Sequence, residues 1–201
     1  MKVLVACEYS GIVRDAFTKR GHDAMSCDLL PTESPGPHYQ GDVRDILDDG
    51  FDLMIAHPPC TYLSYVATRH WNKPGRAALR EEALAFFMLF INAPIDKICV
   101  ENPVGYPNTI YRKPDQIIHP YYFGEPFQKR TCLWLKNLPL LVWDKSKAIK
   151  PPPMYICQGK KSKGKRINWC EGLKSKSSKE RSRTFQGIAD AMAEQWGGNN
   201  D

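Results

Sequence analysis

The sequence lacks any long hydrophobic run, although hydrophobic residues make up 42% of its 201 positions. No apolar stretch approaches the ~20 residues that a membrane-spanning helix needs. The first residues also lack the pattern of a signal peptide, because a single lysine leads directly into a strand-like segment. These features argue against a membrane-spanning protein, and we expect a cytoplasmic protein with no membrane partner.

Paired cysteines are also missing. The chain has seven cysteines, an odd number, and no C-x-x-C pair. This pattern argues against a disulfide framework and against a zinc ribbon. The spacing of His57, Cys60, His70 and His119 matches no zinc pattern either. We therefore expect a reducing compartment and no metal site.

Acidic residues are scarce in one segment. From Lys145 to Arg183 there are 13 Lys and Arg against 2 Asp and Glu, a balance of +11, whereas the rest of the chain carries −5 of the total of +6. Such asymmetry is typical of a polyanion partner, most simply nucleic acid. Tyr155, Ile167 and Trp169 favour contact with that partner over a merely solvated loop. We expect the basic segment 145–183 to contact phosphates.

The division into domains follows the same composition. Residues 144–183 are expected to form a basic, lysine-rich insert that contacts nucleic acid. Residues 1–143 together with 184–196 are expected to form the catalytic domain.

Apolar runs alternate with helical patterns along that domain, which predicts an α/β fold with a mostly parallel central sheet flanked by helices. The expected helices are Ile12 to Arg20, Ala77 to Asn92 and Thr184 to Trp196. The expected strands are Lys2 to Cys7, Ala24 to Cys27, Leu53 to Ala56, Lys97 to Val100 and Thr131 to Leu135. Gly41 to Leu47 is expected as a short edge of the sheet, and residues 29–39, 65–76 and 104–128 as irregular segments.

Cys60 stands just beyond one of these strands. The run Leu53 to Ala56 stops at Pro58 and Pro59, because proline cannot donate to a ladder, and the thiol follows on a stiff turn. Ligands of open α/β sheets bind at this edge. Since a thiolate is a strong nucleophile, we interpret Cys60 as a functional residue rather than one more small buried side chain.

Glu101 occupies the same place on another strand, because it directly follows the apolar run Lys97 to Val100. The carboxyl ends of parallel strands meet at one edge, so Cys60 and Glu101 are expected to share a crevice. Partial burial there is expected to raise the pKa of Glu101 towards neutrality and to make it a candidate acid.

The first βαβ unit carries groups that suit an adenosyl cofactor. The tight turn at Tyr9 to Gly11 would approach the polar tail of the cofactor. Asp28 stands at the end of the second strand, where a carboxylate receives a ribose hydroxyl, and Asp42 is placed to meet an adenine amino group. The turn holds one glycine where a dinucleotide fingerprint has three, so this pattern alone indicates little.

In their order along the chain, these residues resemble the motifs of the DNA (cytosine-5) methyltransferase family, in a short, phage-type form without a large target-recognition domain. Pro59-Cys60-Thr61-Tyr62-Leu63-Ser64 resembles the Pro-Cys-Gln-x-x-Ser nucleophile motif, and Glu101-Asn102-Pro103 resembles Glu-Asn-Val. The weaker correspondences are Ala6 to Gly11 for the first cofactor loop, Gly41-Asp42-Val43 for Gly-Asp-Ile, Gln128-Lys129-Arg130 for the start of Gln-x-Arg-x-Arg, and Arg183 to Trp196 for the closing helix.

The resemblance implies a Rossmann-like class I methyltransferase fold. It implies transfer of a methyl group from S-adenosyl-L-methionine to C5 of a cytosine flipped out of DNA, in a bacterial or phage-infected host cytoplasm. Cys60 would attack C6, Glu101 would hold N3, Asn102 would fix the nucleophile loop, and Arg130 would contact the base or its phosphate. The implied cofactor-binding residues are Glu8, Tyr9, Ser10, Gly11, Asp28, Asp42, Val43 and Pro59.

The chain also departs from the family pattern. The first cofactor loop lacks the family's glycine cluster, Thr61 replaces the Gln after the nucleophile, and Cys132 replaces the second Arg of Gln-x-Arg-x-Arg. A large recognition domain is missing, and lysines among serines favour phosphate contact over base readout. We therefore expect low sequence specificity, or a partner or self-association that supplies specificity.

Other functions stay open. A DNA amino-methyltransferase has an Asp/Asn/Ser-Pro-Pro-aromatic motif, which His57-Pro58-Pro59-Cys60 matches only at the prolines. A catalytically degenerate methyltransferase fold could bind nucleic acid through residues 145–183. A C5 methyltransferase that acts on RNA or on a free cytosine nucleotide would account for the missing recognition domain.

Overall fold

The computed structural model of the chain describes residues 1–151, 155–156, 164, 166–167 and 182–198. Most of the predicted basic insert, including Trp169, therefore lies outside the described residues, and its contact with phosphates stays a prediction. Within the insert the structure describes a short antiparallel pair, β8 (Tyr155–Ile156) and β9 (Arg166–Ile167).

A seven-stranded sheet forms the centre of the molecule, with the strand order β3-β2-β1-β4-β5-β7-β6. The pairs among β3, β2, β1, β4 and β5 are parallel, whereas β7 runs antiparallel to both β5 and β6. This sheet confirms the predicted α/β fold with a mostly parallel centre. The strands are β1 (Lys2–Ala6), β2 (Asp23–Asp28), β3 (His38–Gln40), β4 (Leu53–Ala56), β5 (Lys97–Pro103), β6 (Gln116–Ile118) and β7 (Thr131–Lys136).

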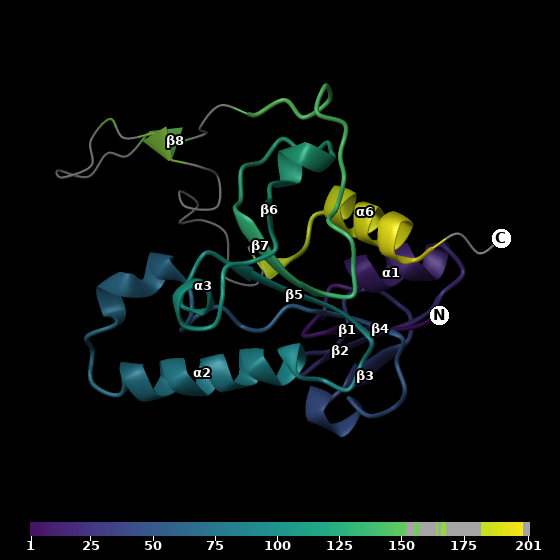
Figure 1. Ribbon diagram of the computed structural model, residues 1–201, viewed down its shortest axis with the longest axis horizontal. Helices are drawn as coiled ribbons and strands as arrows, with labels where there is room; N and C mark the ends of the chain where they lie inside the picture. The colour runs from purple at the N-terminus through teal and green to yellow at the C-terminus, as the bar shows by residue number, and fades with distance from the viewer. Residues whose placement is uncertain (152–154, 157–163, 165, 168–181, 199–201) are drawn as a thin grey trace.

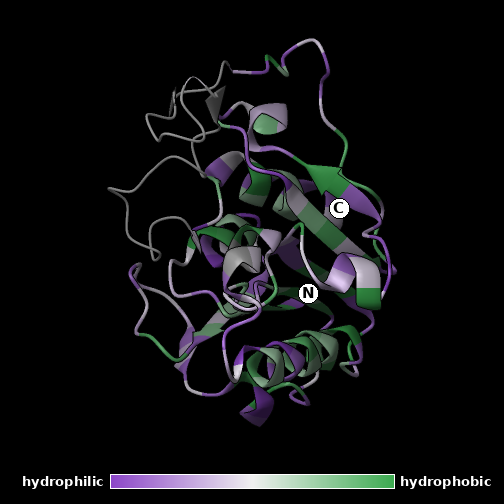
Figure 2. Cartoon of the chain, turned by 90° about the vertical axis from the view of Figure 1, so that its left-hand side faces the viewer, coloured by the Kyte–Doolittle hydropathy of each residue, from purple (hydrophilic) through white to green (hydrophobic). Residues whose placement is uncertain are grey.

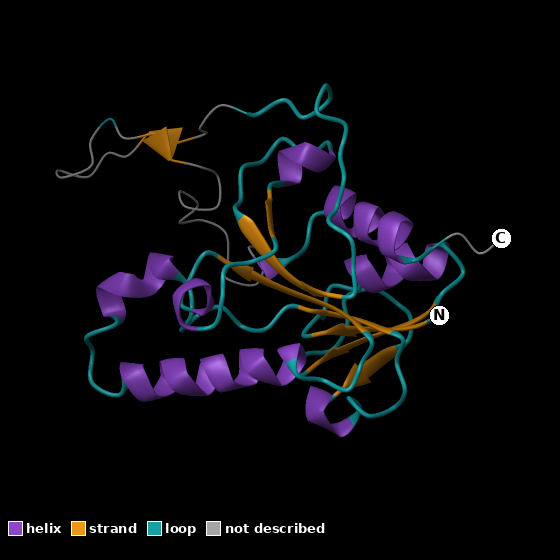
Figure 3. Cartoon of the chain, viewed as in Figure 1, coloured by secondary structure: helices purple, strands orange, loops and turns teal. Residues whose placement is uncertain are grey.

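Helices cover both faces of this sheet. The helices α1 (Ile12–Lys19) and α6 (Gln186–Trp196) pack against each other on one face, and α2 (Arg76–Ile91) lies on the other (Figure 1). Figure 3 shows the sheet between these two helical layers. The shorter helices are η1 (Val43–Asp45), η2 (Tyr65–His70), α3 (Pro107–Ile110) and η3 (Pro120–Phe123).

The layers follow from the alternation of side chains along each strand. In β1, Val3 and Val5 point to the core beneath α1 and α6, whereas Leu4 points to the core beneath α2. All three side chains are fully buried, which explains why the sequence of β1 is a continuous apolar run. Figure 2 shows both hydrophobic and hydrophilic residues on α2, which lies at the bottom of that view, and the helix buries Phe87 and Phe90.

Some expected boundaries are wrong, and each has a physical reason. The strand predicted to end at Val100 continues to Pro103, because Glu101 and Asn102 pair with Leu133 and Cys132 of β7. The segment Gly41 to Leu47 forms the 3₁₀ helix η1 rather than an edge of the sheet. The Asp42 side chain caps that helix by accepting a hydrogen bond from the Arg44 backbone.

Three segments expected to be irregular contain regular structure. Residues 29–39 lead into β3, residues 65–76 contain η2, and residues 104–128 contain α3, β6 and η3. These elements are at most six residues long, so they carry too little periodicity to be recognised from the sequence.

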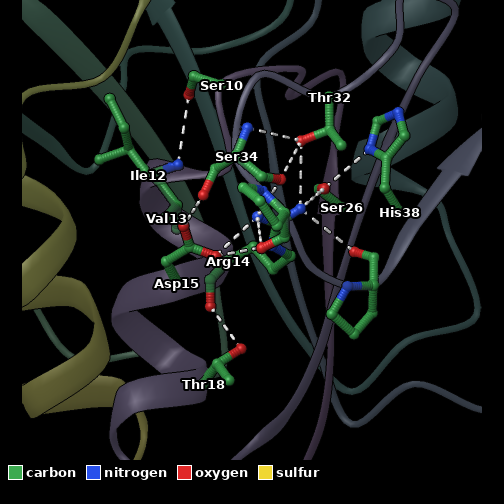
Figure 4. A network of polar contacts seen from close by, with 12 residues as sticks. Ser10, Ile12, Val13, Arg14, Asp15, Thr18, Ser26, Thr32, Ser34 and His38 are labelled. Atoms are coloured by element: carbon green, nitrogen blue, oxygen red, sulfur yellow. Dashed lines mark hydrogen bonds and ion pairs between the residues drawn. The ribbon is translucent and has the colours of Figure 1, made fainter.

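A buried arginine holds the segment between β2 and β3. Arg14 of α1 has a fully buried side chain, and its guanidinium contacts groups of α1, of β2 and of the segment itself (Figure 4). Its partners are the Asp15 carboxylate at 2.7 Å, the Ser26 hydroxyl at 3.1 Å, the Thr32 hydroxyl at 3.3 Å, and the carbonyl oxygens of Ser34 at 3.0 Å and Pro35 at 3.3 Å. The segment is therefore fixed by side-chain bonds rather than by a helix or sheet ladder of its own.

Replacing Arg14 tests how much its guanidinium contributes to the stability of the fold. We expect Arg14→Met to lower the free energy of unfolding by about 3 kcal/mol, because buried carbonyls and one carboxylate lose their donors. Arg20→Met is the matched control, since Arg20 makes an exposed ion pair with Glu194 and its loss should cost less than about 1 kcal/mol. Urea unfolding of both variants measures the difference, and equal losses would contradict the assigned role.

Candidate functional site

The Cys60 thiol lies at the carboxyl edge of the sheet, just beyond β4. Its side chain is exposed. The chain turns sharply after it, because the backbone N–H groups of Leu63 and Ser64 both donate to the Cys60 carbonyl oxygen. The Asn102 side chain of β5 donates to the Pro58 carbonyl oxygen at 2.8 Å. Asn102 thus connects the Cys60 turn directly to the neighbouring strand.

The other end of the Cys60 turn is tied to the residues that follow β5. The Tyr106 N–H donates to the Leu63 carbonyl oxygen at 2.8 Å, and the Tyr65 N–H donates to the Val104 carbonyl oxygen at 3.2 Å. Gly105 lies between these bonds, where any Cβ atom would clash with the Leu63 carbonyl oxygen. A glycine is therefore needed for the close approach of the two backbones.

Glu101 lies beside the same turn, as the sequence predicts for the shared edge. Its side chain is only 14% exposed, and one carboxylate oxygen lies 3.2 Å from Nδ1 of His57. The parallel register explains this pairing, because Ala56 is opposite Val100 and the next residues, His57 and Glu101, are then neighbours.

The expected rise in the pKa of Glu101 is wrong. Burial opposes ionisation, but the hydrogen bond with His57 and the positive charge of Lys129 outweigh it and lower the pKa of this carboxyl. Glu101 is therefore held as a carboxylate, and any acid role requires a proton supplied by another group.

A cavity of about 240 Å³ gathers several of the predicted cofactor residues. Asp28, at the end of β2, and Asp42, at the start of η1, contribute the carboxylates, and Phe86 of α2 contributes an aromatic ring. Such a cavity suits a ligand with hydroxyl groups and a flat apolar part. The other lining residues are Cys7, Cys27, Leu29, Gly41, Val43, Arg44 and Pro59.

The two carboxylates are oriented by their neighbours. Asp28 accepts a hydrogen bond from the Leu30 backbone at 2.9 Å. The hydrogen bond from the Arg44 backbone, opposed by burial and reinforced by the Arg44 guanidinium at 2.7 Å, lowers the pKa of Asp42. Asp42 is thus an anion with both carboxylate oxygens engaged by Arg44, one by its backbone N–H and one by its guanidinium.

A second, smaller cavity of about 50 Å³ holds the rest of the predicted cofactor loop. It is lined by Tyr9, Ser10 and His57, and also by Cys7, Glu8, Ser182, Arg183 and Thr184. Cys7 lines both cavities, and its left-handed backbone, with φ of 58°, turns the chain between them. A strained residue of this kind is common at functional sites.

Glu8 and Gly11 hold the start of α1 in place, although Glu8 also lines the smaller cavity. The Glu8 carboxylate is buried and accepts hydrogen bonds from the N–H groups of Val13 at 2.7 Å and Arg14 at 3.2 Å. It therefore satisfies donors at the helix N-terminus. Gly11 precedes the helix with φ of 76°, a conformation that favours glycine.

Arg130 is not brought to Glu101 by any described contact. It is exposed just before β7, and its charge acts on His119, whose pKa is lowered by burial and then by Arg130 and Lys150. Lys129 instead lines a small cavity together with Glu101. Sequence reasoning missed both Lys129 and His57 as neighbours of Glu101. For His57 the signal was its position one residue beyond β4.

Aromatic and arginine side chains lie in and around the segment that follows the Cys60 turn. The Arg76 guanidinium lies 4.2 Å from the centre of the Tyr62 ring and donates to the Thr61 carbonyl oxygen at 3.0 Å. The Arg80 guanidinium lies over both Trp71 and Tyr106. The surface beside the thiol is therefore positively charged and aromatic, a combination that suits nucleic acid.

The described residues hold no group of three or more His, Cys, Asp or Glu arranged for a metal ion. Among those same residues, no helix combines the length and the apolar character that a membrane span requires. A comparison with known protein families finds no matching family model, and a comparison with curated proteins finds no match.

Thiol labelling tests the exposure of Cys60. Burial raises the pKa of Cys7 and Cys99, and it raises the pKa of Cys27 to about 12 and that of Cys132 to about 11. Because the thiolate is the reactive form, we expect iodoacetamide at mildly alkaline pH to label Cys60 at least about tenfold faster than these four. Peptide mapping measures the order, and faster labelling of any of the four would contradict it.

Proposed function

We propose that the chain is an S-adenosyl-L-methionine-dependent DNA (cytosine-5) methyltransferase with a class I methyltransferase fold. The observations that carry the proposal are an exposed Cys60 thiol on the turn after β4 and a largely buried Glu101 carboxylate on the neighbouring strand β5. Asn102 joins the two by its hydrogen bond to Pro58. This arrangement suits covalent attack on a ring whose nitrogen is held by a carboxyl group.

The larger cavity fits the adenosyl part of the cofactor. Asp28 would accept the ribose hydroxyls, and Phe86 with Val43 would contact the adenine ring. The amino-acid end would extend past Cys7 towards Tyr9 and Ser10, which line the smaller cavity. When bound, the cofactor would supply the methyl group for C5.

The chain's own residues would carry the rest of the reaction. The Cys60 thiolate would form a bond from Sγ to C6, and the electron pair displaced from the C5–C6 double bond would make C5 nucleophilic. Glu101 would accept a hydrogen bond from the exocyclic amine and, once protonated, would donate one to N3. Loss of the C5 proton to a base would restore the double bond and release Cys60.

The surface beside Cys60 supports DNA as the substrate. Arg76, Arg80 and the rings of Tyr62 and Trp71 would contact phosphates and unstacked bases around a flipped cytosine. These contacts carry little sequence information, in line with the expected low specificity. Amino-group methylation is less well supported, because His57, at the first position of that motif, is engaged with Glu101.

Covalent trapping tests the proposal. Incubation with S-adenosyl-L-methionine and a duplex containing 5-fluorocytosine should give a stable protein–DNA adduct, because fluorine at C5 cannot leave as the proton does. Cys60→Ala should abolish the adduct, and mass spectrometry should place the bond on the peptide that contains Cys60. An adduct that persists in Cys60→Ala, or its absence from a wild-type protein that binds the cofactor, would contradict the proposal.

Cofactor affinity tests the larger cavity separately. We expect Asp28→Asn to weaken binding of S-adenosyl-L-methionine about tenfold or more, because the ribose loses a charged acceptor while the Leu30 contact can persist. Asp23→Asn is the matched control, since Asp23 is exposed at the opposite end of the same strand. Isothermal titration calorimetry measures both, and equal affinities would remove the ribose assignment.

A further inference from the structure

His57 lies beside Glu101 and just before the Cys60 turn. Its backbone N–H donates to the Ala6 carbonyl oxygen at 2.9 Å, so the residue continues the line of β4 beside β1. Its side chain is 9% exposed, and Nδ1 lies 3.2 Å from the Glu101 carboxylate. The ring is therefore held on one side by the strand and on the other by the carboxylate.

The second ring nitrogen of His57 has no partner within the described residues. Nε2 is buried and makes no hydrogen bond, although His57 lines the smaller cavity beside Tyr9 and Ser10. An unpaired buried polar atom is energetically unfavourable, so its presence calls for an explanation. An imidazolium carries a proton on both ring nitrogens, so Nε2 can keep its proton while Nδ1 gives one up.

The proposed reaction creates a need for a proton at Glu101. Cytosine N3 is an acceptor, and an ionised carboxylate is also an acceptor, so the two repel unless a proton lies between them. Glu101 is held ionised by His57 and Lys129 before the base arrives. Some neighbouring group must therefore deliver a proton when N3 approaches.

We propose that His57 is a positioning residue that hands this proton to Glu101, an inference that rests on the proposed cytosine chemistry. The Nδ1–H bond of the imidazolium breaks as an O–H bond forms on the Glu101 carboxyl. That carboxyl then donates to N3, and His57 is left as neutral imidazole. On release of the product the proton returns from Glu101 to Nδ1, so no net charge or electron is consumed.

The other titratable groups that face this pair are poorer carriers. An imidazole exchanges protons near neutral pH, whereas a lysine such as Lys129 ordinarily holds its proton far above that range. The remaining groups are neutral buried thiols, a carboxylate bound to α1 and a guanidinium paired with Glu33 at 2.6 Å. They are Cys7, Cys99, Cys132, Glu8 and Arg183. The Tyr9 phenol also lines the smaller cavity, where it lies within hydrogen-bond distance of the Ser182 hydroxyl at 3.3 Å.

The pH dependence of adduct formation distinguishes proton transfer by His57 from a purely structural role of its ring. For the wild type, single-turnover adduct formation with the 5-fluorocytosine duplex should rise with pH as Cys60 ionises. It should then fall at alkaline pH, where a proton is no longer supplied to Glu101. His57→Asn keeps an amide donor near the position of Nδ1 but cannot give up a proton. We expect its rate near neutral pH to fall about 100-fold or more, and the alkaline decline to disappear.

His22→Asn is the matched control. His22 is also a buried histidine whose ring nitrogens have no described partner, but it lies at the amino end of β2, on the opposite edge of the sheet. Its substitution should leave the shape of the profile unchanged. A His57→Asn profile that is merely scaled down, or that matches the wild type, would overturn the inference while leaving the proposed function intact.

A second measurement does not depend on activity. Carbon-detected NMR of the protein without substrate should show the pKa of Glu101 rising in His57→Phe, because the hydrogen bond that lowers it is removed while burial persists. An unchanged Glu101 titration would show that the two side chains are not coupled and would overturn the inference. If the wild type forms no adduct at any pH, the proposed function fails and the relay has no reaction to serve.

Discussion

The site depends on the way β4 and β5 end at different points along a shared register. The pairing of Ala56 with Val100 is the last one between them, and β4 then turns at Pro58 and Pro59. β5 continues because β7 pairs with it through Pro103. Glu101 and Asn102 therefore lie on a paired strand, and Asn102 binds the backbone that leads into the Cys60 turn. Functional groups on helices and strands keep their geometry better than those on loops.

Opposing electrostatic effects act on the groups at this edge. Burial alone would favour a neutral Glu101, but His57 and Lys129 favour the charged form and prevail. Within the described residues no cation acts on the thiols of Cys7 and Cys27 in this way, and burial with neighbouring carboxylates raises their pKa. One edge of one sheet thus holds an exposed thiol, an ionised carboxylate and inert thiols, and the difference comes from their local surroundings.

Much of this arrangement could be predicted from the sequence. Apolar runs located the main strands and helices, and the polar residues after Ala56 and Val100 predicted that the Cys60 turn and Glu101 lie at one edge of the sheet. The short strands β3 and β6 could not be predicted, since three residues carry no period and their pairing is set by distant strands. The charge state of Glu101 and the helix-capping role of Glu8 were missed for the same reason, because each depends on a partner that only the folded register supplies.

The identity of the methylated atom is the most decisive test of cytosine-5 methylation through Cys60 and Glu101. An unmethylated duplex incubated with the protein and S-adenosyl-L-methionine would be digested to nucleosides and analysed by chromatography and mass spectrometry against authentic standards. Attack of Cys60 on C6 predicts 5-methyldeoxycytidine as the new nucleoside. Methylation of an exocyclic amine, as N4-methyldeoxycytidine or N6-methyldeoxyadenosine, would contradict it, because neither product needs the Cys60 and Glu101 pair.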